Sequence, residues 1–161
     1  MKVAKNKIFS RPCLLQLVED LKKQGKKIVF TNGCFDIIHL GHIRLLEQAK
    51  TLGDFLIVGI NSDESVRRLK GHERPIIQQE DRAEILAALE AVNAVTIFSE
   101  DTPETLIKMI RPDIHIKGGD YDIDQVPEAK VVEEYGGQVR FIPVVPGRST
   151  TELIERIKKG G

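Results

Sequence analysis

The stretch "IVFTNGCFDIIHLGH", residues 28–42, decides the fold of this 161-residue chain. It begins within the apolar run of residues 27–31, which is of the kind found in strands that are buried on both faces of a sheet. Asn32-Gly33 ends this run, and one Cys, one Asp and two His follow before the helical pattern that begins near residue 41. A strand, a polar turn and a helix in this order begin a strand–helix–strand unit. The stretch therefore predicts a polar site at the carboxyl end of a buried strand.

The same alternation continues along the whole chain. The other strand-like runs are residues 54–60, 94–98, 113–117 and 138–144. Amphipathic helical patterns cover residues 12–25, 43–53, 63–69, 80–92, 103–110, 127–136 and 150–159. Such alternation requires right-handed crossovers and gives a parallel sheet with helices on both faces. We predict an α/β fold, a single Rossmann-like doubly wound domain over residues 1–161 with a five-stranded parallel sheet. Residues 1–26 are expected to be an N-terminal helical extension packed on it.

The composition excludes several classes of partner. The 24 basic and 24 acidic side chains balance, so no overall field favours nucleic acid or a membrane surface. The chain has no Trp and only 5% aromatic residues, which argues against a base-stacking surface. Two cysteines cannot form a disulfide framework, and no apolar run is long enough to span a membrane. With no apolar segment after the basic N-terminus, we expect a cytoplasmic protein.

The cluster after the first strand allows three chemical interpretations. Cys34, Asp36, His39 and His42 could bind a metal, but their spacing matches no common zinc pattern, so no metal site is predicted. A Cys–His nucleophile is possible by composition, yet the stretch carries no signature of a cysteine hydrolase. Simple packing of two histidines in a turn would leave the flanking glycines unexplained.

An anion site accounts for more of these residues. Gly33 allows a tight turn out of the strand, and Gly41 removes a side chain where backbone must approach a ligand. The helix that begins near residue 41 directs free N–H groups and its positive dipole end to the sheet edge. Because His39 and His42 add donors there, the pattern favours a phosphate site.

The segment "GCFDIIHLGH" resembles the G-x-F-D-x-x-H-x-G-H motif of the HIGH-type nucleotidyltransferase superfamily, which includes cytidylyl- and adenylyltransferases. The resemblance implies that His39 and His42 are catalytic, contacting a nucleoside triphosphate and stabilising charge on its phosphates. It also implies that the nucleotide site is lined by Gly33, Cys34, Phe35, Asp36 and Gly41.

Near the C-terminus, "GRSTTE" has both a structural and a functional interpretation. Ser149 and Glu152 form a capping-box pattern, and an exposed helix N-terminus is also an anion site. In the superfamily a similar S-T-T segment binds the triphosphate. The resemblance therefore assigns Ser149, Thr150 and Thr151 to the nucleotide, with Arg148 as a charge partner.

Two further clusters lie in loops, one after the helix that follows the second strand and one directly after the fourth strand. The basic segment 67–76 is either a solvated turn or a source of cations for the phosphates. A lysine in this region reaches the phosphates in related enzymes, so Lys70 is our third catalytic candidate. The segment "KGGDY" is either a simple turn or part of the nucleotide site through Lys117, Gly118 and Asp120. The candidate substrate-binding residues are Asn61, Asp63, Arg74, Arg82 and Tyr121.

The resemblance is most extensive to the D-glycero-β-D-manno-heptose 1-phosphate adenylyltransferases, in segments spread from residue 28 onward such as "LIVGINSDESVRRLKG" and "RPDIHIKGGDY". It implies transfer of AMP from ATP, with Mg²⁺, to a sugar 1-phosphate supplied by a separate sugar kinase. The product would be ADP-heptose for lipopolysaccharide or surface glycans, and relatives are commonly homodimers. Two departures from the family pattern are His115, where an aliphatic residue is usual, and the segment 121–132.

Two other functions remain open from the sequence. A cytidylyltransferase acting on glycerol phosphate or another polyol phosphate would share the same motif. A nucleotide- or metal-binding module without turnover would share parts of it. Phosphate-binding residues in four separate clusters favour the enzyme.

Overall fold

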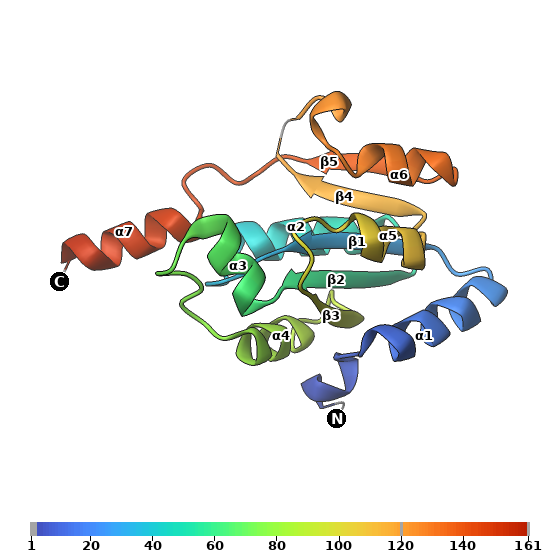
Figure 1. The fold of residues 1–161 in the computed structure, drawn as a ribbon, viewed down its shortest axis with the longest axis horizontal. Helices are drawn as coiled ribbons and strands as arrows, with labels where there is room; N and C mark the ends of the chain where they lie inside the picture. Colours follow the sequence, from blue (N-terminus) through green and yellow to red (C-terminus); the bar gives the residue numbers. More distant parts are fainter. Residues whose placement is uncertain (1–2, 120, 161) are drawn as a thin grey trace.

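A five-stranded sheet forms the centre of the chain, and the computed structural model describes residues 3–119 and 121–160. Each pair of neighbouring strands is parallel, and the strand order is β3-β2-β1-β4-β5 (Figure 1). The strands are β1 (Ile28–Gly33), β2 (Phe55–Asn61), β3 (Ala94–Phe98), β4 (Ile114–Gly118) and β5 (Gln138–Ile142). The predicted α/β class with a parallel sheet of five strands is confirmed.

Helices connect the strands and flank the sheet. The α-helices are α1 (Arg11–Lys23), α2 (Leu40–Thr51), α3 (Asp63–Lys70), α4 (Gln79–Ala87), α5 (Glu104–Ile110), α6 (Ala129–Glu134) and α7 (Thr150–Gly160). Two short 3-10 helices are η1 (Ala4–Lys7) and η2 (Ile123–Gln125). The helix predicted over residues 80–92 ends earlier, at Ala87, and the chain then turns into β3.

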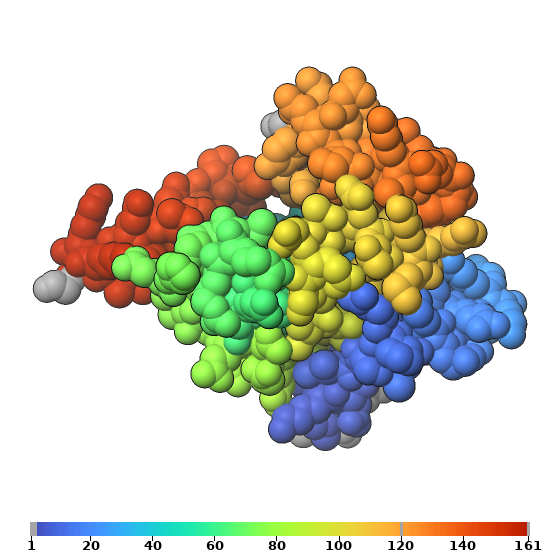
Figure 2. All heavy atoms as spheres, viewed as in Figure 1, coloured from blue at the N-terminus to red at the C-terminus, as the bar shows by residue number. Residues whose placement is uncertain are grey.

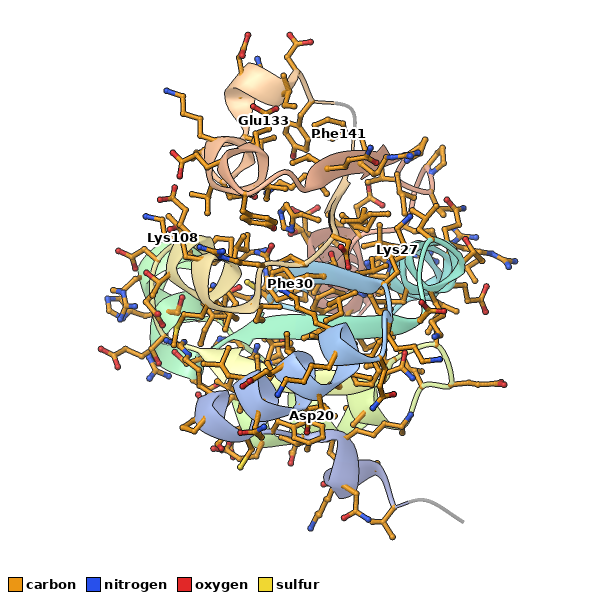
Figure 3. All side chains as sticks on the ribbon, turned by 90° about the vertical axis from the view of Figure 1, so that its right-hand side faces the viewer. Asp20, Lys27, Phe30, Lys108, Glu133 and Phe141 are labelled. Carbon is orange, nitrogen blue, oxygen red and sulfur yellow. The ribbon has the colours of Figure 1, made fainter. Side chains whose placement is uncertain are left out.

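Each face of the sheet has its own apolar core. On one face, β-strand residues pack with Leu46 of α2 and Leu86 of α4. On the other, Phe30 of β1 packs with Leu14 of α1 and with residues of α5 and α6. Phe30 is fully buried, whereas Lys108 of α5 and Glu133 of α6, labelled with it in Figure 3, are exposed. Full burial of one such apolar side chain contributes about 1.5–3 kcal/mol, so the two cores together hold the helices on the sheet.

The strand order places a crevice at the carboxyl ends of β1 and β4. From β1 the chain adds β2 and β3 on one side, whereas β4 and β5 lie on the other. In open α/β sheets, ligands bind at such a topological switch point. The last helix, α7, starts near this edge and stands out from the rest of the surface at one end (Figures 1 and 2). In the described part of the chain, no helix has the length and apolar character needed to cross a membrane.

Candidate active site

Two stacked imidazoles lie at the N-terminus of α2, directly after β1. His39 is the N-cap of α2, and its Nδ1 accepts a 3.1 Å hydrogen bond from the Gly41 N–H. The His39 N–H in turn donates to Nδ1 of His42 at 3.3 Å, and the ring centroids are 3.8 Å apart. Because each Nδ1 accepts a hydrogen bond, these contacts assign the proton of each neutral ring to Nε2. The pair therefore offers two Nε2–H donors at the switch point.

Both imidazoles are kept neutral by their surroundings. Burial makes the largest contribution to lowering the pKa of His42, and the neighbouring His39 and Lys70 act in the same direction, so that together they bring the pKa to about 4. Burial, assisted by the Arg148 guanidinium, also lowers the pKa of His39. Two neutral rings can stack without charge repulsion, and they can donate hydrogen bonds to an anion without carrying charge themselves.

The backbone next to the two histidines is closely packed at Gly41 and has an unusual conformation at Phe35. A Cβ added to Gly41 would lie 2.8 Å from the His39 ring, so only glycine lets that ring fold back over the helix start. Phe35 has a φ of +48°, which is unusual for a residue with a side chain, and its ring centroid lies 5.1 Å from that of His42. Such strained positions cluster at functional sites.

The N-terminus of α7 is tied to the same turn. The Thr150 hydroxyl donates a 3.1 Å hydrogen bond to the carbonyl oxygen of Ile37. Ser149 caps the helix, since its Oγ accepts a 3.0 Å hydrogen bond from the Glu152 N–H, as the sequence predicts. The positive end of the α7 dipole and its free N–H groups therefore lie close to the imidazole pair.

One pocket of about 270 Å³, which we call the central pocket, joins these parts. Nine of the predicted site residues line it: His39, Gly41, His42, Lys70, Gly118, Arg148, Ser149, Thr150 and Thr151. An apolar wall that the sequence reasoning missed completes it, formed by Leu45 and residues 142–145. The apolar residues at the end of the last strand-like run, 138–144, could have predicted this wall, but they were assigned only to the sheet.

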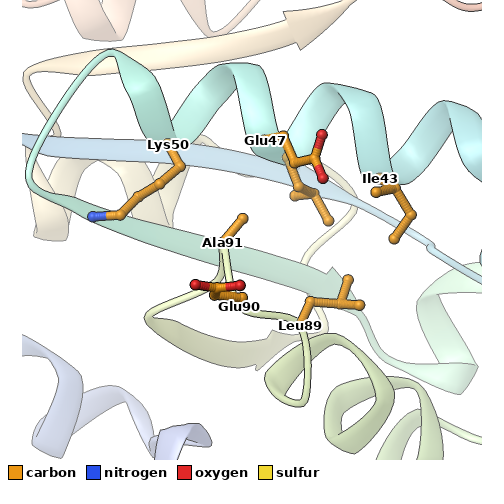
Figure 4. Close-up of a pocket in the computed structure, with 7 residues that line it drawn as sticks. Ile43, Glu47, Lys50, Leu89, Glu90 and Ala91 are labelled. Carbon is orange, nitrogen blue, oxygen red and sulfur yellow. The ribbon is translucent and has the colours of Figure 1, made fainter.

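Another hollow, of about 380 Å³, lies between α2 and the loop before β3 (Figure 4). It is lined by Ile43, Glu47 and Lys50 from α2 and by residues 89–91 from the loop. Its lining includes none of the predicted site residues, so the central pocket is the candidate active site.

Asp36 does not line the central pocket but holds the loop that follows α3. Its carboxylate accepts hydrogen bonds from the backbone N–H groups of Ile76 and Ile77. It also forms an ion pair with Arg74, whose Nε lies 2.9 Å from the carboxylate. Burial acts to raise the pKa of Asp36, but these donors outweigh it and hold the pKa below its ordinary value. Asp36 and Arg74 therefore join the loop that follows α3 to the turn after β1, while Nη2 of Arg74 is buried without a partner among the described residues.

Arg82 does not line the central pocket either. Its guanidinium group is fully buried and donates to the carbonyl oxygens of Cys34, Asn61 and Ile77 at 2.7–2.8 Å. It also forms a 2.8 Å ion pair with Asp63. All three guanidinium nitrogens are thus engaged with protein oxygens, which gives Arg82 a structural role. None of Arg82, Asn61 and Asp63 lines the central pocket, and their contact with a substrate stays a prediction. Burial raises the pKa of the nearby Cys34 thiol.

The "KGGDY" segment divides between two sides of the sheet edge. Gly118 lines the central pocket, but Lys117 does not, and its Nζ lies 3.4 Å from Glu128. The half-exposed ring of Tyr121 is 6.0 Å from the same Nζ. Asp120, the other predicted nucleotide ligand of this segment, lies outside the described residues.

The central pocket is chemically suited to phosphate oxygens. Its polar groups are imidazole N–H donors, hydroxyls, the cations of Lys70 and Arg148, and a helix N-terminus. Over residues 3–119 and 121–160, no group of three or more His, Cys, Asp or Glu is placed to hold a metal ion. Because Mg²⁺ prefers carboxylate, phosphate and water oxygens, it fits this site only as part of a bound nucleotide.

A Rossmann-like parallel sheet with an anion-binding pocket at its switch point defines the class of α/β proteins that hold phosphate-bearing ligands. Within that class, residues 30–156 match the cytidylyltransferase-like family, and the chain belongs to this family. The resemblance to nucleotidyltransferases predicted from the histidine motif is confirmed.

Curated relatives of this chain carry the name "Bifunctional protein HldE". The chain is 51% identical over 153 residues to the one from Geobacter sulfurreducens and 53% identical over 148 residues to the one from Pseudomonas paraeruginosa. These matches cover 95% and 92% of the chain but only 31% of each relative, so the chain spans about a third of their length.

Solved structures agree with the fold. A lipopolysaccharide core biosynthesis protein from Thermoplasma volcanium is 30% identical, with a TM-score of 0.62 over 75% of this chain and 98% of that one. A pantoate-beta-alanine ligase from Francisella tularensis, 18% identical, has a TM-score of 0.63 over 94% of this chain and 76% of that one. The second likeness shows the shared Rossmann-like fold alone.

Proposed function

We propose that this chain transfers AMP from ATP to a sugar 1-phosphate, with D-glycero-β-D-manno-heptose 1-phosphate as acceptor, giving ADP-heptose and pyrophosphate. The observation that carries the proposal is the central pocket, where the imidazole pair, Lys70 and the N-terminus of α7 surround one space of about 270 Å³. The family match and the names of the relatives support a nucleotidyl transfer. The choice of ATP and a heptose rests on the sequence resemblance.

The chemistry needs positioning and charge stabilisation more than an activating base. An oxygen of the acceptor phosphate is already ionised at neutral pH, so it can attack the α-phosphorus of ATP directly. A new P–O bond forms as the bond to the β-phosphate breaks, and pyrophosphate leaves with that electron pair. The residues therefore have to align the two phosphates and neutralise the charge that develops.

Each element of the pocket has a part in that task. The Nε2–H groups of His39 and His42 would donate to the α-phosphate oxygens, and Lys70 would balance charge on the bridging and leaving oxygens. The N-terminus of α7, with Arg148, would bind the β- and γ-phosphates. Mg²⁺ would enter on the triphosphate, because phosphate oxygens and water can supply its ligands.

The wider setting is also part of the proposal. The relatives are bifunctional and about three times as long, so we infer that this chain supplies one of two activities and that a separate sugar kinase supplies the acceptor. A homodimer in the cytoplasm is the proposed working form.

A direct assay tests the function. Incubation with ATP, Mg²⁺ and the heptose 1-phosphate should release pyrophosphate and give an ADP-sugar that mass spectrometry detects. His42→Ala should abolish most of this turnover, with a loss of about two to four kcal/mol of transition-state stabilisation. Pyrophosphate release from CTP and glycerol phosphate, with none from ATP, would instead establish the cytidylyltransferase. Release from neither pair would refute both transfers.

A further inference from the structure

Lys117 faces away from the central pocket although its neighbour lines it. A Cβ added to Gly118 would point at Leu45 of α2, on the pocket side of the sheet. Since successive side chains of a strand point to opposite faces, Lys117 projects from the other face. His115, two residues earlier, confirms this direction because its ring stacks on Phe30 in the second core. The sheet edge therefore carries cations on both of its sides.

A buried acidic group holds Lys117 in place. The carboxylate of Glu128 is only 4% exposed and accepts from Lys117 Nζ at 3.4 Å and from His115 Nε2 at 3.2 Å. A carboxylate has only acceptors, so His115 must carry its proton on Nε2. Nδ1 of His115 is then buried without a partner in residues 3–119 and 121–160. Such an arrangement costs free energy that an aliphatic residue at 115 would avoid, which suggests that the pair serves more than packing.

The proposed reaction requires a second phosphate site, for the acceptor. In an in-line transfer, the attacking oxygen and the leaving oxygen lie on opposite sides of the α-phosphorus. If the β- and γ-phosphates lie at the N-terminus of α7, in the central pocket, the acceptor must approach the α-phosphorus from the side that faces away from them. Its phosphate is anionic and needs a cation there. Lys117 is suitable, because an ammonium group has three donors and Glu128 uses one of them.

Resting on the proposed function, we propose that Lys117 binds the phosphate of the sugar 1-phosphate acceptor, and that Glu128 and His115 position its ammonium group. Lys117 then belongs to the acceptor site and not to the nucleotide site. Tyr121, whose half-exposed ring lies beside the ammonium group, borders the same site. Lys117 is a binding residue, whereas Glu128 and His115 act through it.

Two binding measurements on the full chain separate the sites. The first is the dissociation constant of a non-hydrolysable ATP analogue with Mg²⁺, and the second is that of D-glycero-β-D-manno-heptose 1-phosphate in its presence. Lys117→Met should weaken sugar phosphate binding about tenfold or more and leave nucleotide binding within about twofold. The matched control, Lys70→Met, should do the reverse because Lys70 lines the central pocket. Weaker nucleotide binding by Lys117→Met, or no change in either constant, would overturn the assignment.

A double-mutant comparison tests the positioning role. Glu128→Gln keeps the shape of the side chain and should weaken sugar phosphate binding severalfold, but it should add nothing in a Lys117→Met background. Equal losses in both backgrounds, together with a lower melting temperature, would reduce Glu128 to a structural residue. If Glu128→Gln does not fold, Lys117→Met still decides the acceptor site, since a third of its side chain is exposed.

The outcome is distinguishable from failure of the proposed function. A wild-type protein that binds both ligands but forms no ADP-sugar refutes the transfer, while the two dissociation constants still decide where Lys117 acts. A wild-type protein that binds no sugar phosphate overturns this inference.

Discussion

The hydroxyl of Thr150 donates a hydrogen bond to the carbonyl oxygen of Ile37, a residue 113 positions earlier in the chain. This bond joins the N-terminus of α7 to the turn that carries His39. Thr150→Val keeps the shape of the side chain but removes the donor, so we expect weaker nucleotide binding with a loss of folding free energy of only about 1 kcal/mol. Calorimetric titration with ATP measures the effect. Thr102→Val, an exposed position, is the control, and equal affinities in both variants would contradict the prediction.

Gly41→Ala tests the close packing of the His39 ring. The new methyl group would lie 2.8 Å from that ring, so the imidazole must move while the helix itself tolerates alanine well. We expect turnover to fall by up to about a hundredfold, because misplacement by about 1 Å can have that effect. The melting temperature should change little. Gly160→Ala meets open space and should keep wild-type turnover, and a Gly41→Ala enzyme with normal turnover would exclude tight placement of His39.

The low pKa of His42 makes stability depend on pH in a defined direction. Its pKa falls from 6.5 to about 4 on folding, because burial, His39 and Lys70 disfavour the charged ring. Between these values the unfolded chain binds the proton more strongly, so the contribution is complete above pH 6.5 and is lost as the pH falls toward 4. Urea denaturation of wild type and His42→Gln at several pH values measures this. The two free energies of unfolding should converge with acidification, and parallel curves would show that His42 is not responsible.

Arg82→Met should destabilise the fold strongly. The change leaves the Asp63 carboxylate and three backbone carbonyl groups without their donor, and removal of one partner from a buried ion pair costs about 3–5 kcal/mol. Arg68→Met is the matched control, since its ion pairs with Glu64 and Asp101 are exposed and are worth at most about 1 kcal/mol. Urea denaturation compares the two. Similar small losses in both variants would contradict the structural role of Arg82.

Asp36→Asn should loosen the loop after α3. The Asp36 carboxylate accepts from the amides of Ile76 and Ile77, and an asparagine has fewer acceptor sites and no charge for Arg74. We expect hydrogen exchange at these two amides to accelerate about tenfold or more. Asp54→Asn is the control, because Asp54 accepts from the Lys27 amide at the opposite end of the sheet. Unchanged exchange at Ile76 and Ile77 would show that Asp36 does not hold the loop.

The sheet could be predicted because its strands are short, apolar and separated by clear helical patterns. Residues 94–98 were predicted with the bounds that β3 has, and β1 and β2 differ by one or two residues at their ends. The central pocket was also predictable in large part, since the segment from His39 to His42 is local in sequence and its strand–turn–helix setting is recognisable.

Some predicted site residues do not line the central pocket, and the placement of Arg82 among them depends on contacts between segments that are distant in the sequence. Arg82 binds oxygens up to 48 residues away, and nothing in its neighbourhood in the sequence shows that it is fully buried. Lys117 is different, because the alternation of Ile114 and Ile116 with His115 and Lys117 already places the lysine on the other face. The "KGGDY" motif predicts a turn, and the assignment of Lys117 to the nucleotide site leaves this alternation out of account. The contact between His115 and Glu128 required the tertiary structure.

No residue of α7 is buried, although the N-terminus of this helix forms part of the central pocket. Its attachment depends on the Thr150 bond, the exposed Lys158–Glu73 ion pair and partial contact of a few apolar side chains. If a triphosphate binds here as proposed, part of its intrinsic binding energy would be needed to hold this helix in place. The measured affinity would then report how well α7 is pre-organised as well as how well the phosphates fit. Substitutions far along α7, remote from any phosphate, should tune nucleotide affinity.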